Sequence, residues 1–285
     1  MLSAQNIVRA CLPRRVRNWL RSPARSARWL CDEIQHTAGL DRTITIRPGW
    51  PLRCHPAAYR CAYSAQHIDP EQVAEFDSFI STCQPGMVLF DAGAHFGLFS
   101  LAALHYGGSS AKVIAVDPSP TACRMMRIQA RLNGVEPRLH VVQASVGDCE
   151  GWQKMLAVGV LAGGYFVPAT GGYPEAELTR TEALTLDRLA AKFNITPTHV
   201  KIDVEGGEAA VLRGGKNILA PANAPLLFVE MHNQIVRQRN ADPSETLSLL
   251  RGFRYCLFNV DGTPVIEEKL LKSDLARIVA RKISE

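Results

Sequence analysis

A turn rich in glycine follows the first predicted strand and is suited to binding a nucleotide-like ligand. It reads Asp91-Ala92-Gly93-Ala94-His95-Phe96-Gly97 and leads into a helix. Glycines let the backbone approach a ligand closely, and a helix N-terminus offers unpaired N–H groups. Asp91 could accept a hydrogen bond from a cationic amine. Asp117 ends the next strand, where a carboxylate can accept hydrogen bonds from both hydroxyls of a ribose.

A nicotinamide dinucleotide is the main alternative ligand for this turn. Such a site needs Gly-x-Gly-x-x-Gly, and His95 stands where the second glycine must lie beneath a pyrophosphate. An adenosine ligand with an amino-acid end near Asp91 and no diphosphate fits better, which describes S-adenosylmethionine. A nicotinamide-dependent oxidoreductase and a catalytically inactive Rossmann-like binding module remain the alternatives.

A second acidic motif, Lys201-Ile202-Asp203-Val204-Glu205-Gly206-Gly207-Glu208, follows a later strand. Asp203, Glu205 and His232 come at carboxyl ends of strands, so we expect them at the same sheet edge as the glycine turn. A carboxylate or imidazole there could take the proton of an attacking hydroxyl. The predicted catalytic residues are therefore Asp203, His232 and Glu205, with Asp203 or His232 as the base.

Other polar residues of this region have structural or metal-binding interpretations. Lys201 is expected to pair internally with a neighbouring acid, and Glu208 to be the solvated start of a helix. A metal-dependent transferase needs carboxylates and an amide around a hard cation, which Asp203, Glu230 and Asn233 could imitate. No metal site is predicted.

Alternating strand and helix patterns position these motifs. Apolar runs predict strands at 87–90, 112–116, 139–142, 199–202 and 226–229, and periodicity predicts helices at 98–106, 120–132 and 243–251. The dipeptide Asp261-Gly262 between runs 255–260 and 263–266 predicts a hairpin. The predicted fold is α/β, a Rossmann-like doubly wound and mostly parallel sheet that ends in an antiparallel hairpin.

The motifs resemble those of the FkbM-type methyltransferases over about residues 85–235. The most specific part of the resemblance is Lys201-Ile202-Asp203-Val204-Glu205-Gly206, whereas His95 departs from the Asn common in the family. The resemblance implies a class I methyltransferase-like fold, S-adenosylmethionine as cofactor, and methylation of a hydroxyl on a sugar, glycan or secondary-metabolite acceptor. The residues expected to bind the cofactor are Asp91, Gly93, His95, Gly97, Asp117 and Ser145.

Charge divides the 285-residue chain into two regions. The net charge is +5, but seven arginines precede the first acid, Asp32, and the remainder carries −2. Residues 1–70 are predicted to be a basic, mainly helical extension suited to peripheral contact with a membrane, and residues 71–285 the methyltransferase domain. An irregular substrate-side insertion is expected at about 148–184. Because the excess of positive charge is local to this arm, it argues against specific nucleic-acid binding.

The cysteines and the chain start indicate a cytoplasmic protein. Eight scattered cysteines without a C-x-x-C pair predict reduced, buried thiols and no zinc site. No apolar run is long enough to span a bilayer, and no secretory core is present, although the Arg-rich start also resembles a mitochondrial transit peptide. Peripheral association with the inner face of the membrane is the further expectation.

Overall fold

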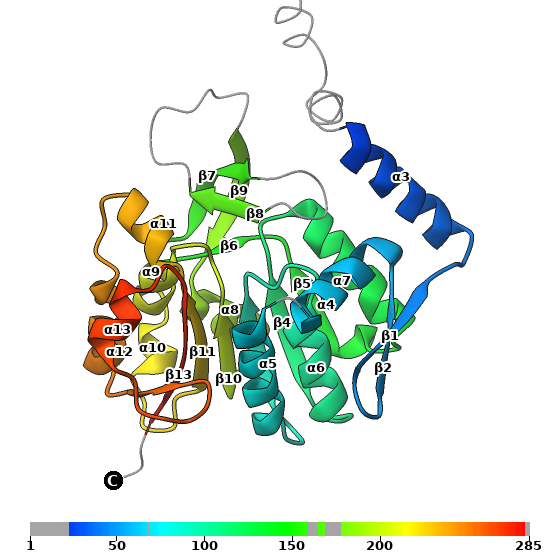
Figure 1. Ribbon diagram of the computed structural model, residues 1–285. Helices are drawn as coiled ribbons and strands as arrows, with labels where there is room; N and C mark the ends of the chain where they lie inside the picture. The colour runs from blue at the N-terminus through cyan, green and yellow to red at the C-terminus, as the bar shows by residue number, and fades with distance from the viewer. Residues whose placement is uncertain (1–22, 68, 159–164, 169–177, 283–285) are drawn as a thin grey trace, which may run out of the picture.

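The centre of the protein is a seven-stranded sheet in the order β12-β13-β11-β10-β3-β4-β5 (Figure 1). The computed structural model describes residues 23–67, 69–158, 165–168 and 178–282. Strands β11, β10, β3, β4 and β5 are parallel, and β13 is antiparallel to both of its neighbours. The strands are β3 Val88–Ala92, β4 Lys112–Val116, β5 Leu139–Val142, β10 His199–Ile202, β11 Leu226–Met231, β12 Cys256–Asn259 and β13 Ala276–Arg281. The predicted α/β, mostly parallel fold is confirmed.

Helices cover both faces of this sheet. Leu89 and Val113 point to one apolar layer and Phe90 and Ile114 to the other, because successive side chains of a strand alternate in direction. The first layer contains α4 Pro56–His67, α5 Pro70–Thr82, α6 Leu98–Tyr106 and α7 Pro120–Leu132. The second contains α8 Leu186–Phe193, α9 Glu208–Arg213, α10 Lys216–Leu219, α12 Ser244–Gly252 and α13 Glu267–Lys272. The structure also has two short helices, η1 Glu136–Arg138 and α11 Asn233–Gln238.

Side-chain caps set where two of the helices begin. The Asp69 carboxylate accepts hydrogen bonds from the N–H groups of Glu71 and Gln72 at the start of α5. The Ser119 hydroxyl accepts one from Ala122 at the start of α7. Each cap is followed by a proline at the first helical position, where the missing N–H costs nothing.

The segment before α5 contains a pair of strands that the sequence does not predict. Helix α3 (Pro23–Thr37) is followed by an antiparallel pair, β1 (Arg42–Arg47) and β2 (Trp50–Cys54). Alternation in β2 buries Trp50 and Leu52 against the first apolar layer, which explains the strand. Most of the predicted basic element, residues 1–22, lies outside the described residues. Among the helices that the structure describes, none is long and apolar enough to cross a membrane.

The described residues of the insertion at 148–184 belong mostly to a small sheet, whereas the sequence predicts irregular or extended structure there. Its four strands have the order β6-β9-β7-β8, with β6 Ser145–Val146, β7 Gly151–Val158, β8 Tyr165–Pro168 and β9 Leu178–Leu184. Gly151, at φ +120°, is the first residue of β7. The other five glycines between residues 148 and 184 lie outside the described residues.

The predicted hairpin at Asp261-Gly262 is also different in the structure. Residues 263–266 make a single bridge between Phe258 and Pro264, and the antiparallel partner of β12 is β13. The Asn259 N–H donates to the Thr263 carbonyl at 2.8 Å and the Val265 N–H to the Leu257 carbonyl at 3.4 Å, so the turn is present but residues 263–266 do not form a strand. The sheet thus closes antiparallel as expected, but through a later segment.

The seven described cysteines are free thiols. Cys54 and Cys123 are buried as predicted, whereas Cys31 and Cys149 are exposed.

Candidate active site

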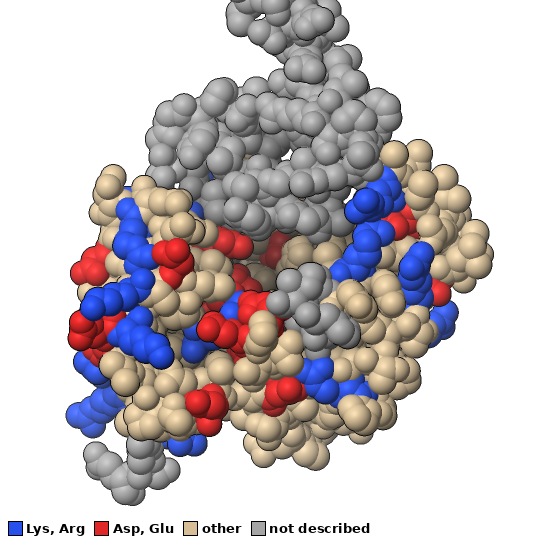
Figure 2. All heavy atoms as spheres, in the orientation of Figure 1, with Lys and Arg blue, Asp and Glu red and all other residues tan. Residues whose placement is uncertain are grey.

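A cavity of about 410 Å³ opens where β3, β4 and β10 end and where the small sheet lies across them. This volume is within the range of about 300–1,000 Å³ that small-molecule sites occupy. Figure 2 shows acidic side chains gathered around a hollow in the middle of this face. The lining includes Gly93, His95, Asp117, Ser145, Asp148, Gln153, Met155, Asp203, Glu205 and Arg213.

The glycine turn after β3 is folded tightly against the loop after β10. The N–H groups of Gly93 and Ala94 both donate to the carbonyl of Val116, at 2.9 and 3.1 Å. A Cβ on Gly93 would lie 1.7 Å from the carbonyl oxygen of Asp203. Gly97 is the left-handed residue that precedes α6. It lines neither this cavity nor a second, smaller cavity described below.

Asp117 is held in place by the backbone of the same turn. Its carboxylate accepts the N–H groups of His95 at 2.9 Å and Ser119 at 2.8 Å. Burial raises the pKa of Asp117 to about 6 despite these hydrogen bonds. Each carboxylate oxygen keeps further acceptor capacity, so a ligand hydroxyl can still bind there.

Asp91 faces a second, smaller cavity of about 110 Å³. Its carboxylate accepts a hydrogen bond from the Ser100 hydroxyl at 2.6 Å, and burial raises its pKa to about 6. The two cavities share Gly93, His95 and Asp203. An extended ligand that passes over the glycine turn would therefore meet both Asp117 and Asp91.

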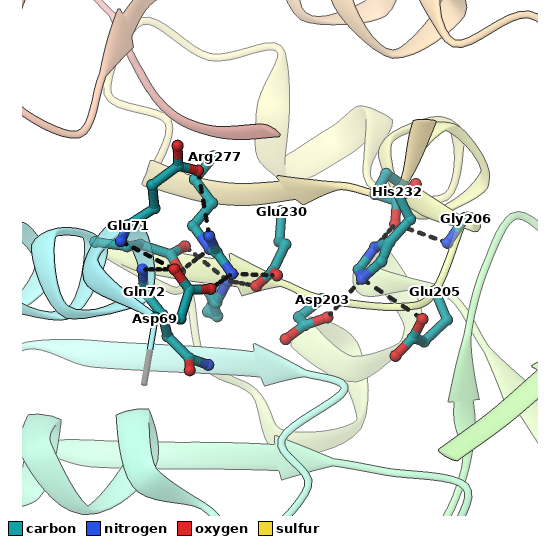
Figure 3. Close-up of polar contacts among 12 residues, drawn as sticks. Asp69, Glu71, Gln72, Asp203, Glu205, Gly206, Glu230, His232 and Arg277 are labelled. Atoms are coloured by element: carbon teal, nitrogen blue, oxygen red, sulfur yellow. Dashed lines mark hydrogen bonds and ion pairs between the residues drawn. The ribbon is translucent and has the colours of Figure 1, made fainter. Parts of the chain in front are cut away.

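His232 lies among three carboxylates beside the main cavity (Figure 3). Its Nδ1 is 2.9 Å from Glu208, and its Nε2 is 3.6 Å from Asp203 and 3.5 Å from Glu205. Burial alone would lower the pKa of His232, but the hydrogen bond to Glu208 and the neighbouring carboxylates outweigh it and raise the pKa to about 9. Burial, and then the charge of Glu230, raise the pKa of Asp203 well above its ordinary value. This cluster thus favours a positive charge at its centre.

Glu208 is not the solvated helix start that the sequence predicts. Its side chain is 2% exposed, accepts the Gly206 N–H at 2.9 Å, and contacts His232. The position at the first turn of α9 is as expected, but the loop 203–207 and the end of β11 enclose it. Glu208 therefore orients His232.

A separate buried network contains Lys201 and Glu230. Lys201 Nζ lies 2.7 Å from Glu75 and 3.4 Å from Glu230, which confirms its internal pairing. Arg277 Nη2 lies 3.0 Å from Glu230 and 2.9 Å from Asp69 (Figure 3). Burial opposes the charge on Lys201, yet the Glu75 carboxylate outweighs it and raises the pKa of Lys201.

This network rules out the metal set that the sequence suggested. Glu230 is bound to the two buried cations, and the Asn233 amide donates to the carbonyls of Leu270 and Ser273. Asp203, Glu230 and Asn233 therefore do not form one site.

Comparison with known families decides the class of enzyme. The sequence model of the "Methyltransferase FkbM domain" matches residues 91–258, more than half of the chain. The chain belongs to the FkbM methyltransferase family. The expected FkbM methyltransferase family is thus confirmed, and the match does not support the nicotinamide-dependent alternative.

Relatives of this FkbM methyltransferase are also methyltransferases. Ribosomal protein L11 methyltransferase of Pelotomaculum thermopropionicum is 32% identical over 134 residues, which cover 42% of this chain and 41% of that protein. The chain thus matches less than half of that relative's length. Among solved structures, a putative rRNA methylase from Clostridium thermocellum has a TM-score of 0.48 at 10% identity, covering 76% of this chain and 98% of that one. An S-adenosylhomocysteine-bound methyltransferase from Podospora anserina has a TM-score of 0.44 at 11% identity, covering 92% and 97%.

Three important residues of this FkbM methyltransferase are absent from the sequence prediction. Glu75 could have been found, because it lies four residues before Phe79 and so on the buried face of α5. Gln153 and Arg277 belong to strands β7 and β13 that were not predicted, and no local pattern indicates their roles.

Proposed function

We propose that the protein transfers the methyl group of S-adenosylmethionine to a hydroxyl of a sugar, glycan or secondary-metabolite acceptor. The position of Asp203 carries the proposal. Asp203 lines both cavities and contacts the Gly93 turn, so its carboxylate lies where cofactor and acceptor must meet. A carboxylate at that point can take the proton of the attacking hydroxyl.

The residues present fit the cofactor. Gly93, His95, Asp117 and Ser145 line the main cavity, and Asp91 faces the smaller one, where it would accept the amine of the methionine end. Bound there, S-adenosylmethionine supplies a methyl group whose carbon–sulfur bond breaks, with its electron pair passing to sulfur, as the acceptor oxygen bonds to carbon. Holding the reacting groups in line contributes up to about 7–11 kcal/mol in well-oriented systems.

Three polar side chains that line the main cavity favour a hydroxylated acceptor. Gln153, Asp148 and Arg213 place a carboxamide, a carboxylate and a guanidinium along the main cavity. Arg213 Nη2 lies 2.9 Å from Asp148, so the pair presents fixed polar groups. Such groups hydrogen-bond to sugar hydroxyls better than to an apolar molecule.

The test is a methyl-transfer assay with the full chain, S-adenosylmethionine and a panel of hydroxylated glycans and metabolites. Asp203→Asn should lower turnover about 10²–10⁴-fold at saturating cofactor. The variant should bind S-adenosylhomocysteine as tightly as the wild type does. Asp274→Asn removes an exposed carboxylate and should leave turnover unchanged. Wild-type turnover in Asp203→Asn would refute this role.

An amine acceptor is the second candidate. Asp203, Glu205 and Glu208 favour a positive charge next to the main cavity, and an ammonium group would satisfy them. The relative from Pelotomaculum is a methyltransferase of ribosomal protein L11. Methylation of protein amines without methylation of any hydroxyl in the panel would favour this candidate.

A further inference from the structure

We infer that Asp203, Glu205 and His232 form a binding site for one divalent transition-metal ion beside the main cavity. Asp203 directly follows β10 and His232 directly follows the neighbouring parallel strand β11, so the sheet itself brings them together. Glu205 comes from the loop after β10. The inference rests on the proposed methyl transfer to a hydroxyl, because the ion would hold the acceptor oxygen.

The spacing of the ligand atoms suits an ion between them. His232 Nε2 is 3.6 Å from Asp203 Oδ1 and 3.5 Å from Glu205 Oε2, and the three ligand atoms lie within 4.8 Å of one another. An N–H···O hydrogen bond spans about 2.7–3.2 Å. Ligand atoms that are each about 2.1 Å from a tetrahedral ion lie roughly 3.4 Å apart. The two distances from His232 Nε2 are thus long for hydrogen bonds and close to those between the ligands of a metal.

Glu208 determines which nitrogen of His232 faces the two carboxylates. The buried Glu208 side chain is 2.9 Å from Nδ1 and is itself fixed by the Gly206 N–H. When Nδ1–H donates to Glu208, Nε2 lies toward Asp203 and Glu205 (Figure 3). An ion that binds there displaces the Nε2 proton and takes its place. A carboxylate behind a histidine in this way fixes the ring and increases the basicity of a metal-binding nitrogen.

The negative charge of this cluster and its exposure to the main cavity also suit a metal ion. Three carboxylates surround one imidazole, while Lys201, the buried cation of β10, is bound to Glu75 and Glu230 instead. The side chains of Asp203 and Glu205 are 33% and 25% exposed, and both line the main cavity. An ion could therefore enter from the cavity and keep a coordination position open for a substrate oxygen.

The donor set indicates the ion and its use. One imidazole and two carboxylates suit Zn²⁺ or Mn²⁺ better than a soft ion, which prefers thiolates. Bound to the acceptor hydroxyl, the ion lowers the pKa of that hydroxyl by acting as a Lewis acid. Asp203 would bind the ion through Oδ1, which faces His232, and the hydroxyl proton would pass to Oδ2 as oxygen bonds to the methyl carbon.

The test measures binding of Co²⁺ alone to the full chain after treatment with a chelator, by visible ligand-field absorption. We expect one Co²⁺ per chain, displaced by Zn²⁺. Glu205→Gln and His232→Ala should abolish the signal, and Glu208→Gln should weaken affinity about 10–100-fold. Asp148→Asn, the same change in another carboxylate of the cavity, should bind Co²⁺ like the wild type.

Binding of S-adenosylhomocysteine and the unfolding temperature are measured on the same samples. An absent Co²⁺ signal, or one unchanged in Glu205→Gln and His232→Ala, would overturn the metal site even if S-adenosylhomocysteine binds normally. A wild-type chain that binds Co²⁺ but not S-adenosylhomocysteine would overturn the proposed methyl transfer instead. Because Glu205→Gln keeps the shape of the side chain, loss of Co²⁺ at an unchanged unfolding temperature supports ligation.

Discussion

The carbonyl oxygen of Asp203 lies against Gly93 so closely that a Cβ on residue 93 would come within 1.7 Å of it. The contact joins the turn that would bind the cofactor to the loop that carries the candidate base. Gly93 also has φ +83°, which residues with a side chain rarely adopt. Both conditions restrict this position to glycine.

We therefore expect Gly93→Ala to weaken binding of S-adenosylhomocysteine at least about tenfold and to destabilise the fold by more than the roughly 1–3 kcal/mol of backbone strain alone. Calorimetric titration and urea unfolding measure the two effects. Gly108→Ala is the matched control, since Gly108 has φ +68° with no atom within 4 Å of the added Cβ. Equal affinities in wild type and Gly93→Ala would show that the two loops can separate without cost.

Cofactor affinity should fall as the pH drops through about 6. The pKa of Asp117 is raised to about 6, so its carboxylate is ionised above that pH and protonated below it. Only the ionised form accepts hydrogen bonds from both ribose hydroxyls. Asp117→Asn should bind S-adenosylhomocysteine more weakly and with a flatter pH profile in titrations between pH 5 and 8. Asp91 also has a pKa of about 6, so Asp91→Asn is titrated in parallel. If Asp117→Asn kept the pH profile of the wild type, the fall in affinity would come from the titration of another group.

Ser100→Ala should move the contribution of Asp91 to higher pH. The Ser100 hydroxyl donates to the ionised Asp91 carboxylate, and its removal disfavours that form, so the pKa of Asp91 should rise further. The midpoint of the affinity profile should shift upward by a measurable fraction of a pH unit. Ser119→Ala is the control, because it removes a helix cap, costing about 0.5–2 kcal/mol, and leaves Asp91 untouched. An unshifted midpoint in Ser100→Ala would contradict the expectation.

Lys201→Met should destabilise the protein by about 3–5 kcal/mol, because it leaves the buried carboxylates of Glu75 and Glu230 without this cation. Urea unfolding measures the free energy. Adding Glu75→Gln to Lys201→Met should restore part of the loss, so the two effects should not add. The exposed Lys272→Met is the comparison and should change stability by less than about 0.5 kcal/mol. Additive losses would show that Lys201 and Glu75 are not coupled.

The central strands and helices were predictable because their signals are local. The apolar run of β4 and the Ser119-Pro120 start of α7 each lie within a few neighbouring residues. Strand β13 was not predictable, because the charged residue Arg277 is typical of an exposed segment and not of a buried strand. That arginine is buried only because Glu230, Glu75 and Asp69 lie against it, and these acids are far away in the sequence.

The candidate site was predictable where a residue directly follows a strand. Asp117, Asp203 and His232 do so, and the topology of a parallel sheet then places them at one edge. Glu230 does not, because it is still inside β11 and its side chain joins the network of Lys201. The role of Glu208 depends on a contact with His232, 24 positions later in the chain, which no local pattern reveals.

The ion pair between Lys201 and Glu75 also joins the part of the chain that matches the FkbM family to a helix that lies outside the match. The stretch shared with the FkbM family starts at residue 91, after α5 has ended. A fragment cut at that boundary would lose Glu75, and with it Phe76 and Phe79, which cover one face of the sheet. The family match is thus shorter than the stretch of chain whose side chains pack on this sheet.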